Sequence, residues 1–246
     1  MIIGGLQKFS LLDFPGYLAA IIFTQGCNFR CQFCYNPMLV WPINEADKLQ
    51  NKKFSEEKEK GYPLISEDSL FSFLRARLGK LDAIVITGGE PTLHPDLPQF
   101  IAKIRKLSFK IKLDTNGTNP KMLGKLIKDK MLDYIAMDIK ASPVKYKETT
   151  QVKPNLNNIR KSLKLIVESG LPYEFRTTVV PGLLSEGDID SIGRMIEGAD
   201  KWYLQKFKND TPLLNSSLSK IKIYSDQEMK KMRSSAEKYV KFCAIR

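Results

Sequence analysis

Short apolar runs alternate with longer amphipathic segments along most of the chain. The predicted strand segments are residues 18–23, 83–87, 110–113, 134–137, 173–180 and 201–207, of which 18–23 is continuous in its apolar residues. Continuous apolar character over so few residues is typical of parallel strands that are covered on both faces. Between them, large apolar residues recur at helical spacing over residues 66–78, 96–107, 120–130, 157–169 and 186–197. This alternation predicts six parallel strands separated by helices, as in an α/β sheet.

The two ends of the chain and one internal segment fall outside this repeat. Residues 1–16 form an entry segment in which Ile2 and Ile3 can make a short strand. Residues 44–60 are rich in lysine, glutamate and asparagine, which predicts an exposed insertion. Beyond residue 208 we expect one helix near residues 226–240 and no further βα unit. The prediction is one domain over residues 1–246, with a core at about 17–207 and a C-terminal extension at 208–246.

Polar or glycine-rich clusters lie at the carboxyl ends of the predicted strands. The first two clusters are Cys27, Cys31 and Cys34, and then Gly88, Gly89 and Glu90. The later strands carry or precede Asp114, Asn116, Asp138, Lys140, Arg176 and Gln205. Parallel barrels and open α/β sheets place their active sites at the carboxyl ends of their strands. We therefore expect these residues to meet in one site.

The cysteine spacing indicates the kind of group that this site holds. Cys27, Cys31 and Cys34 are spaced C-x3-C-x2-C, and thiolate is the soft ligand among the side chains. Three ligands suit a [4Fe-4S] cluster in which one iron is left open, because a closed cluster takes four protein ligands. Structural zinc would need a fourth cysteine or histidine nearby, and the sequence offers none. The remaining thiol, Cys243, is predicted to be a packing residue near the C-terminus.

Composition and charge limit the partners without naming one. The chain has 246 residues, of which 43% are hydrophobic and 27% charged, and its net charge is +12. Many lysines fall on predicted helices or in the insertion, so we interpret the charge as a solvated surface and expect no nucleic acid partner. No run of about 18 apolar residues and no signal peptide is evident, so we expect a cytoplasmic protein without a membrane partner.

Other catalytic arrangements are poorly supported. The sequence has no Ser-His-Asp set, P-loop or HExxH motif, which argues against hydrolytic and phosphoryl-transfer chemistry. His94 is the only histidine, and it is expected to cap the following helix or face solvent rather than act as a general base.

The cysteine motif, with Phe33 before its last cysteine, resembles the cluster motif of the radical S-adenosylmethionine (SAM) superfamily. The flanking segments 10–16, 23–27 and 34–37 resemble the glycyl-radical-enzyme activating proteins, above all the activators of anaerobic ribonucleoside-triphosphate reductase. This resemblance implies a partial (β/α)6 barrel of parallel strands that is open on one side. Six units are also too few to close an eight-fold barrel.

The resemblance further implies a chemistry and a role for each site residue. SAM chelates the open iron, is cleaved reductively to a 5′-deoxyadenosyl radical, and that radical takes hydrogen from a glycine of a partner. Gly88, Gly89 and Glu90 would hold the SAM amino group, and Arg176 the SAM carboxylate. The other residues implied at the SAM site are Phe33, Asp114, Asn116, Asp138 and Lys140, some of which line a monovalent cation site in certain relatives. Gln205 occupies the position at which some relatives carry a histidine that contacts SAM. Because glutamine replaces histidine here, the resemblance does not establish that Gln205 makes this contact.

Several alternatives stay open at this point. The aspartates can instead be helix N-caps, and Arg176 can form a salt bridge. The implied partners are a glycyl radical enzyme, foremost anaerobic ribonucleotide reductase, and an electron donor such as flavodoxin or ferredoxin. A superfamily enzyme acting on a small molecule, such as a 7-deazaguanine synthase, or on RNA is the second hypothesis. The third is a metal-binding module without enzymatic activity.

Overall fold

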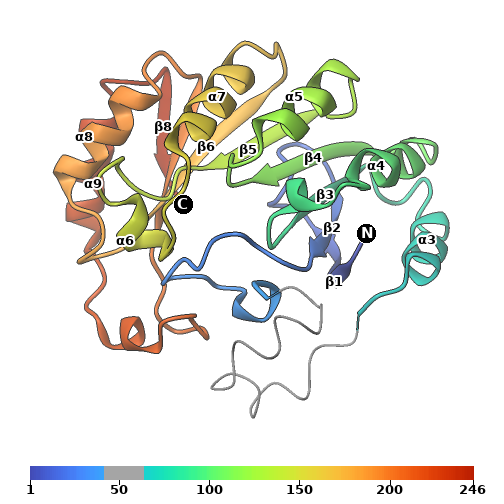
Figure 1. Cartoon of the computed structure of the whole chain (residues 1–246), viewed down its shortest axis with the longest axis horizontal. Helices are drawn as coiled ribbons and strands as arrows, with labels where there is room; N and C mark the ends of the chain where they lie inside the picture. Colours follow the sequence, from blue (N-terminus) through green and yellow to red (C-terminus); the bar gives the residue numbers. More distant parts are fainter. Residues whose placement is uncertain (42–63) are drawn as a thin grey trace.

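The described part of the chain forms a curved sheet of eight strands (Figure 1). The computed structural model describes residues 1–41 and 64–246, so the predicted insertion at 44–60 lies outside the described residues. The strands are β1 (Ile3–Ser10), β2 (Ala19–Thr24), β3 (Ala83–Gly88), β4 (Lys110–Thr115), β5 (Tyr134–Asp138), β6 (Tyr173–Val179), β7 (Lys201–Lys206) and β8 (Phe242–Ile245). They follow one another across the sheet in sequence order. β1 is antiparallel to β2, and every later neighbour is parallel.

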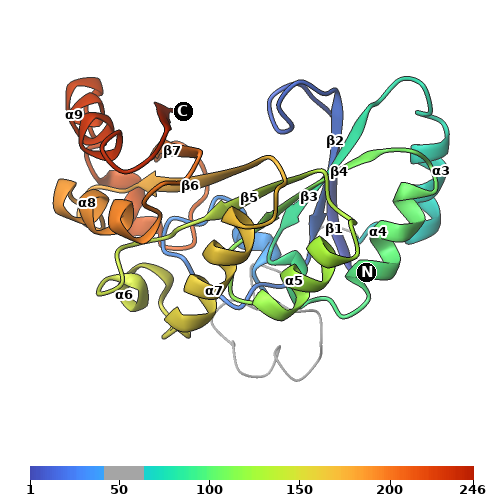
Figure 2. The same ribbon diagram turned by 90° about the horizontal axis from the view of Figure 1, so that it is seen from above.

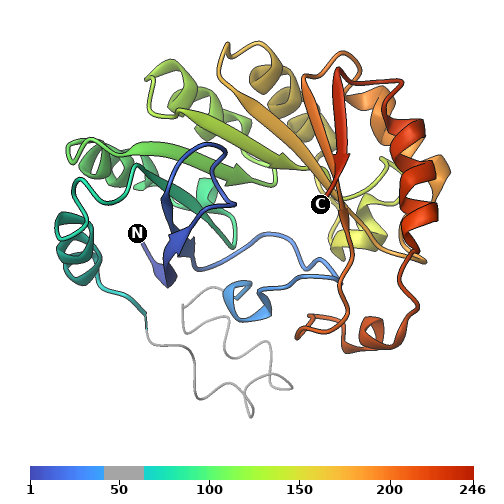
Figure 3. The same cartoon turned by 180° about the vertical axis from the view of Figure 1, so that it is seen from behind.

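Helices cover the outer side of this curved sheet (Figures 1 and 3). Within residues 1–41 and 64–246 the α-helices are α3 (Glu67–Arg75), α4 (Leu97–Arg105), α5 (Pro120–Lys128), α6 (Tyr146–Thr150), α7 (Leu156–Val167), α8 (Glu186–Met195) and α9 (Asp226–Ala236). Short 3-10 helices are η1 (Pro37–Leu39), η2 (Pro91–Leu93) and η3 (Ser216–Lys220). α5 and α7 lie side by side in the views of Figures 1 and 2, with Gly124 of α5 facing Leu165 of α7.

Two apolar clusters explain why the strand sequences are apolar on both faces. Side chains such as Ile22 and Ile86 pack outward in the large cluster between the sheet and the helices. A smaller cluster contains Ile21, Val85 and Tyr134, whose side chains alternate with those of the large cluster along the same strands. Burial on both faces is what the continuous apolar runs predicted, at least for β2 and β3.

The fold class predicted from the sequence is confirmed, and α9 is the helix expected in the C-terminal extension, but the prediction of no further βα unit there is wrong. The six predicted strands correspond to β2 to β7, and the sheet is open, with β1 and β8 as the edges of its described part. The extension adds one more unit, because α9 leads to β8, which pairs in parallel with β7. β8 is four residues long, too short for its apolar pattern to stand out. Cys243 is buried as predicted, and it lies in β8.

The structure contains the short strand expected near the N-terminus and the first expected helix. The strand expected at Ile2 and Ile3 is longer and continues to Ser10. Ser66 caps α3, at the start of the helix expected over residues 66–78, because its side chain accepts a hydrogen bond from the Ser69 N–H. Within the described ranges, the helices are all too short or too polar to cross a lipid bilayer.

Asp188, in the first turn of α8, is a buried carboxylate that stabilises the fold. Its Oδ1 accepts a hydrogen bond from Ser142 (2.6 Å), and its Oδ2 accepts from the Ser185 N–H (2.8 Å) and faces Lys145 (2.9 Å). Burial by itself would raise the pKa of Asp188. The contacts with Ser142, Lys145 and Ser185 outweigh it and lower that pKa to about 2 from the ordinary value of 3.8.

We expect Asp188→Asn to reduce the free energy of unfolding by about 2 kcal/mol near neutral pH. A carboxyl group with a lowered pKa in the folded state stabilises the protein above its ordinary pKa. That stabilisation is lost as the pH falls from about 4 toward 2, so the two proteins should become nearly equal at the acid end. Denaturant unfolding of both proteins, near neutral pH and near pH 2, measures the difference in the free energy of unfolding. A difference that did not depend on pH would assign the effect to packing instead.

Candidate functional site

One cavity of about 380 Å³ gathers every residue that the sequence predicted for the cluster and the cofactor. Its lining includes Cys27, Cys31, Phe33, Cys34, Gly88, Gly89, Glu90, Asp114, Asn116, Asp138, Lys140, Arg176 and Gln205. These residues come from the loop after β2 and from the carboxyl ends of β3 to β7. The parallel sheet therefore brings distant parts of the sequence together at one edge, as the strand-end pattern predicted.

The three cysteines of the loop after β2 are free thiols on the wall of this cavity. Burial raises the pKa of Cys27 to about 11 and that of Cys31 to about 12, and it also raises the pKa of Cys34. Metal binding at these sulfur atoms would therefore release protons. Among residues 1–41 and 64–246, no three Cys, His, Asp or Glu side chains are gathered closely enough for a single metal ion. Three soft ligands spread over one cavity wall fit a larger iron–sulfur group.

Two segments that are distant in sequence hold the cysteine loop in place. On one side, the Gln32 N–H donates to the Thr149 carbonyl (3.2 Å) and the Arg30 N–H to the Thr150 carbonyl (2.9 Å), both at the end of α6. On the other side, Asn215 donates from its N–H to the Gln32 carbonyl (2.9 Å) and from Nδ2 to Gln32 Oε1 (2.7 Å). The position between Cys31 and Phe33 is therefore anchored from both directions.

We expect Asn215→Ala to make a reconstituted cluster less durable. The substitution removes the hydrogen bond from Asn215 Nδ2 to Gln32, and it also removes the cap that Asn215 Oδ1 gives to Ser217 at the start of η3. Loss of the bond to Gln32 alone, worth about 1 kcal/mol, corresponds to a roughly fivefold faster loss of iron. Iron release to a chelator under anaerobic conditions measures this. Asn209→Ala is the matched control, because Asn209 lies in the same segment but donates to the Ile221 carbonyl. Equal rates for both variants would mean that the Asn215 contact does not hold the loop.

The two glycines before Glu90 allow the end of β3 to lie against the backbone of the cysteine loop. A Cβ atom on Gly89 would lie 2.0 Å from the Gly26 carbonyl oxygen, and Gly88 has a φ of +111° that disfavours other residues. The Glu90 N–H also donates to the Gly26 carbonyl (2.8 Å). In the structure the two glycines bring the end of β3 against the residue that precedes Cys27.

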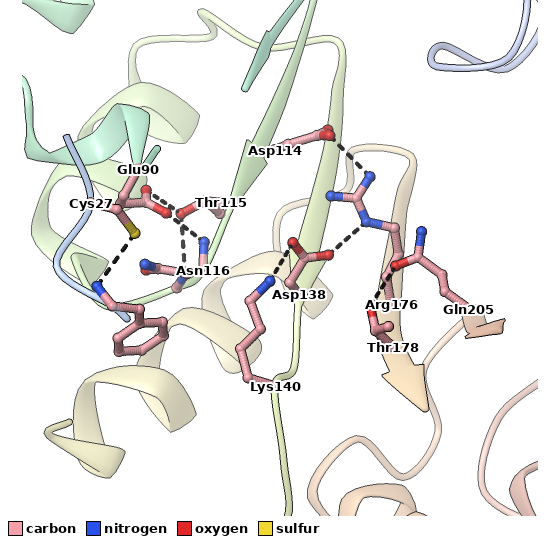
Figure 4. Close-up of polar contacts among 12 residues, drawn as sticks. Cys27, Glu90, Asp114, Thr115, Asn116, Asp138, Lys140, Arg176, Thr178 and Gln205 are labelled. Atoms are coloured by element: carbon pink, nitrogen blue, oxygen red, sulfur yellow. Dashed lines mark hydrogen bonds and ion pairs between the residues drawn. The ribbon is translucent and has the colours of Figure 1, made fainter. Parts of the chain in front are cut away.

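The Glu90 carboxylate links the ends of β3 and β4 (Figure 4). Its Oε1 accepts hydrogen bonds from the Thr92 N–H (3.1 Å), Thr92 Oγ1 (2.5 Å) and Thr115 Oγ1 (2.7 Å). Its Oε2 accepts from the Asn116 N–H (2.6 Å). Only 1% of the residue is exposed, and burial raises the pKa of Glu90. Because Oε2 carries one of these four bonds, it is the atom with room for another donor.

A chain of alternating charges crosses the cavity wall from β4 to β6 (Figure 4). Arg176 donates from Nε to Asp138 Oδ1 (2.7 Å) and from Nη1 to Asp114 Oδ2 (2.9 Å). Lys140 Nζ lies 3.0 Å from Asp138 Oδ2, and Lys112 Nζ lies 2.8 Å from Asp114 Oδ1. Burial alone would raise the pKa of both aspartates, but the neighbouring Arg176 and the two lysines hold both below the usual range. Both aspartates are thus charged, and neither caps a helix.

The other predicted residues take individual positions around the cavity. Phe33 is 3% exposed, and Lys140 Nζ lies 5.9 Å from the centre of its ring. Asn116 donates from Nδ2 to Asn28 Oδ1 (2.9 Å), which ties the end of β4 to the cysteine loop. Gln205 Oε1 accepts a weak hydrogen bond from Thr178 Oγ1 (3.4 Å). His94 neither caps α4 nor simply faces solvent, because its half-buried Nε2 lies 3.0 Å from the Gln25 carbonyl oxygen.

Sequence reasoning missed part of the cavity wall. Gln7 and Asp13 line it from β1 and the following turn, which the sequence presented only as an entry segment. Lys112, which pairs with Asp114 but does not line the cavity, was also missed, although a signal existed. It lies two residues before Asp114 in β4, and a period of two places both side chains on the same face of the strand.

The chain belongs to the radical SAM superfamily, because residues 21–194 match that family. Members of this superfamily use a [4Fe-4S] cluster and SAM. The sequence is 32% identical over 250 residues to a candidate glycyl-radical enzyme activating enzyme of Methanocaldococcus jannaschii, which covers all of this chain and 95% of that protein. It is 30% identical over 167 residues to a GTP 3′,8-cyclase of Helicobacter pylori, which covers 65% of this chain and 46% of that enzyme.

Solved structures show the same fold. QueE from Escherichia coli superposes with a TM-score of 0.56 at 17% identity, covering 100% of this chain and 93% of QueE. A domain of the pyruvate-formate lyase-activating enzyme from Bacteroides vulgatus superposes with a TM-score of 0.53 at 16% identity, covering 67% of this chain and 99% of that domain. At these identities the similarity describes the fold alone.

Proposed function

We propose that this protein is a glycyl-radical-enzyme activating enzyme and that its partner is an anaerobic ribonucleoside-triphosphate reductase. The observation that carries this proposal is the similarity to the Methanocaldococcus jannaschii protein, which extends over the whole chain. The similarity to the GTP 3′,8-cyclase leaves about a third of this chain unmatched. The segments flanking the cysteines, which resemble the activators of that reductase, support the choice of partner.

The residues of the cavity fit the two cofactors of the superfamily. Cys27, Cys31 and Cys34 would hold the [4Fe-4S] cluster through three thiolates. When bound, the cluster supplies the electron that cleaves SAM into methionine and a 5′-deoxyadenosyl radical. A small electron-transfer protein such as flavodoxin or ferredoxin would reduce the enzyme. The protein's own contribution is to orient SAM and to keep water from the reacting atoms.

Polar groups of the chain would orient SAM from two sides. Glu90 Oε2 would accept a hydrogen bond from the SAM amino group, because this oxygen has one protein partner and lines the cavity. Lys140 and Arg176 would attract the SAM carboxylate as positive charges. Arg176 uses Nε and Nη1 for the aspartates, so Nη2 is the nitrogen that remains for such a contact. The apolar side chains of Ile21 and Phe23 complete the wall and exclude water.

The open sheet provides the route for a protein substrate. β1 and β8 are the edges of the described sheet, so the barrel wall is not continuous between them. A flexible loop that carries a glycine would enter on this open side and reach the cavity. The radical would then abstract a hydrogen atom from that glycine.

Glycyl-radical formation on the reductase tests this proposal. Reconstituted protein, SAM, a reductant and the anaerobic ribonucleoside-triphosphate reductase of the same organism are mixed without oxygen. We expect a glycyl-radical signal in EPR and release of one deoxyadenosine per radical, with neither in a mixture that contains Cys31→Ala. Deoxyadenosine that forms only when GTP is added, without any partner protein, would instead assign the enzyme to small-molecule chemistry.

A further inference from the structure

We propose that His94 is a positioning residue that couples the first cluster ligand, Cys27, to the segment that would bind SAM. His94 is the only histidine of the chain, and it does not line the cavity. Its ring nevertheless contacts the backbone two residues before Cys27. The coupling rests on the proposed function, because Glu90 is assigned there to the SAM amino group.

The backbone that leads into Cys27 is bound along one side by the segment after β3. The carbonyls on either side of Gln25 accept hydrogen bonds from the N–H groups of Gly89 and Glu90, both at 2.8 Å. The Gln25 carbonyl itself lies 3.0 Å from His94 Nε2. Three successive carbonyls therefore meet one short segment, and the middle one meets a side chain. A substitution of His94 can remove this middle contact and leave the two backbone contacts in place.

A single turn of 3-10 helix, η2, connects His94 to Glu90. At its start, the Glu90 carboxylate accepts a hydrogen bond from the Thr92 N–H (3.1 Å). At its end, the His94 N–H donates to the Pro91 carbonyl (3.1 Å). Both ends of the turn are thus fixed by hydrogen bonds. A ligand that holds the Glu90 carboxylate also holds His94, and through the Gln25 carbonyl it holds the approach to Cys27.

The contact with Gln25 requires a hydrogen on Nε2 of His94. A carbonyl oxygen can only accept a hydrogen bond, so a lone pair on Nε2 would be repelled at this distance. Burial lowers the pKa of His94, so the ring is neutral near neutral pH and carries a single N–H. The geometry therefore assigns this hydrogen to Nε2 and leaves Nδ1 as the acceptor.

Long-range ¹H–¹⁵N NMR of the untagged, reconstituted and unreduced protein tests the contact. Because the chain has one histidine, the ring signals belong to His94 without further assignment. We expect the pattern of the Nε2–H tautomer. The pattern of the Nδ1–H tautomer would overturn the proposal, because Nε2 would then have no hydrogen to donate to Gln25.

The protection that SAM gives to the cluster measures the coupling. Iron release to a chelator is followed without reductant, and the rate without SAM is divided by the rate with saturating SAM. In His94→Leu this ratio should fall about fivefold, as expected for one lost hydrogen bond. His94→Gln should keep most of the protection, because its amide nitrogen can donate in place of Nε2. Leu93→Ala is the matched control, since Leu93 adjoins His94 but is 43% exposed, and it should keep the wild-type ratio.

A wild-type ratio in His94→Leu would also overturn the proposal. A purely structural role gives that result, because it changes both rates by the same factor. If His94→Leu does not fold, the tautomer of the wild-type protein decides. Failure to form a glycyl radical, with normal protection of the cluster by SAM, would count against the proposed function and leave the role of His94 intact.

Discussion

Replacing Cys31 with alanine is expected to abolish cluster assembly and, with it, all cleavage of SAM. Cys31 is the most buried of the three cavity cysteines, and Gln32 beside it is anchored to α6 and to Asn215. The two remaining thiolates cannot hold a cluster that depends on three, and alanine offers no ligand. Iron and sulfide content after anaerobic reconstitution and deoxyadenosine release should both fall to the background of a cluster-free sample.

Cys243→Ala is the matched control for this loss. Cys243 is also a buried thiol, but it lies in β8 and packs in the core rather than lining the cavity. Its variant should keep the cluster and cleave SAM at close to the wild-type rate. Cleavage at the wild-type rate by the Cys31 variant would mean that the cysteine motif has been wrongly assigned.

Glu90→Gln is expected to weaken SAM binding by about tenfold to a hundredfold and to lower stability. Oε1 and Oε2 each accept a hydrogen bond from a backbone N–H, of Thr92 and Asn116 respectively. A glutamine has one amide NH₂ group, so in either orientation this group faces a backbone donor. A lost hydrogen bond to a charged group costs about 1.5 to 3 kcal/mol, which corresponds to that range of affinity.

Equilibrium binding of SAM to the reconstituted variant measures the change in affinity. The midpoint of thermal unfolding of the variant measures the change in stability. Glu237→Gln is the control, because Glu237 forms an exposed pair with Arg233 on α9. The control should match the wild-type protein in both measurements. If Glu90→Gln matched it too, Glu90 would neither link the strand ends nor bind the cofactor.

The six core strands and the residues that line the cavity could be predicted because both depend on local sequence patterns. Short segments between the helical patterns identified β2 to β7, and the polar residues at the end of each segment meet because the carboxyl ends of parallel strands share one edge. The burial of Cys27, Cys31 and Cys34 in one cavity follows from their close spacing after β2.

What the sequence did not predict depends on contacts between distant segments. Nothing local marks Asn215 as the partner of Gln32, since the two are 183 residues apart. The pairing of Arg176 with two aspartates depends on the register of β4, β5 and β6, which no single strand contains. The role of Gly89 also requires the position of Gly26 in three dimensions. β8 was not predicted because four residues are too few to show a recognisable strand pattern of apolar positions.

The central claim is that this cavity holds an iron–sulfur cluster with one iron open to SAM. The most direct test is low-temperature EPR of the anaerobically reconstituted and reduced protein, recorded with and without SAM. We predict a [4Fe-4S]⁺ signal that changes when SAM is added, followed by release of deoxyadenosine. A signal that is indifferent to SAM, or zinc in place of iron, would contradict the account.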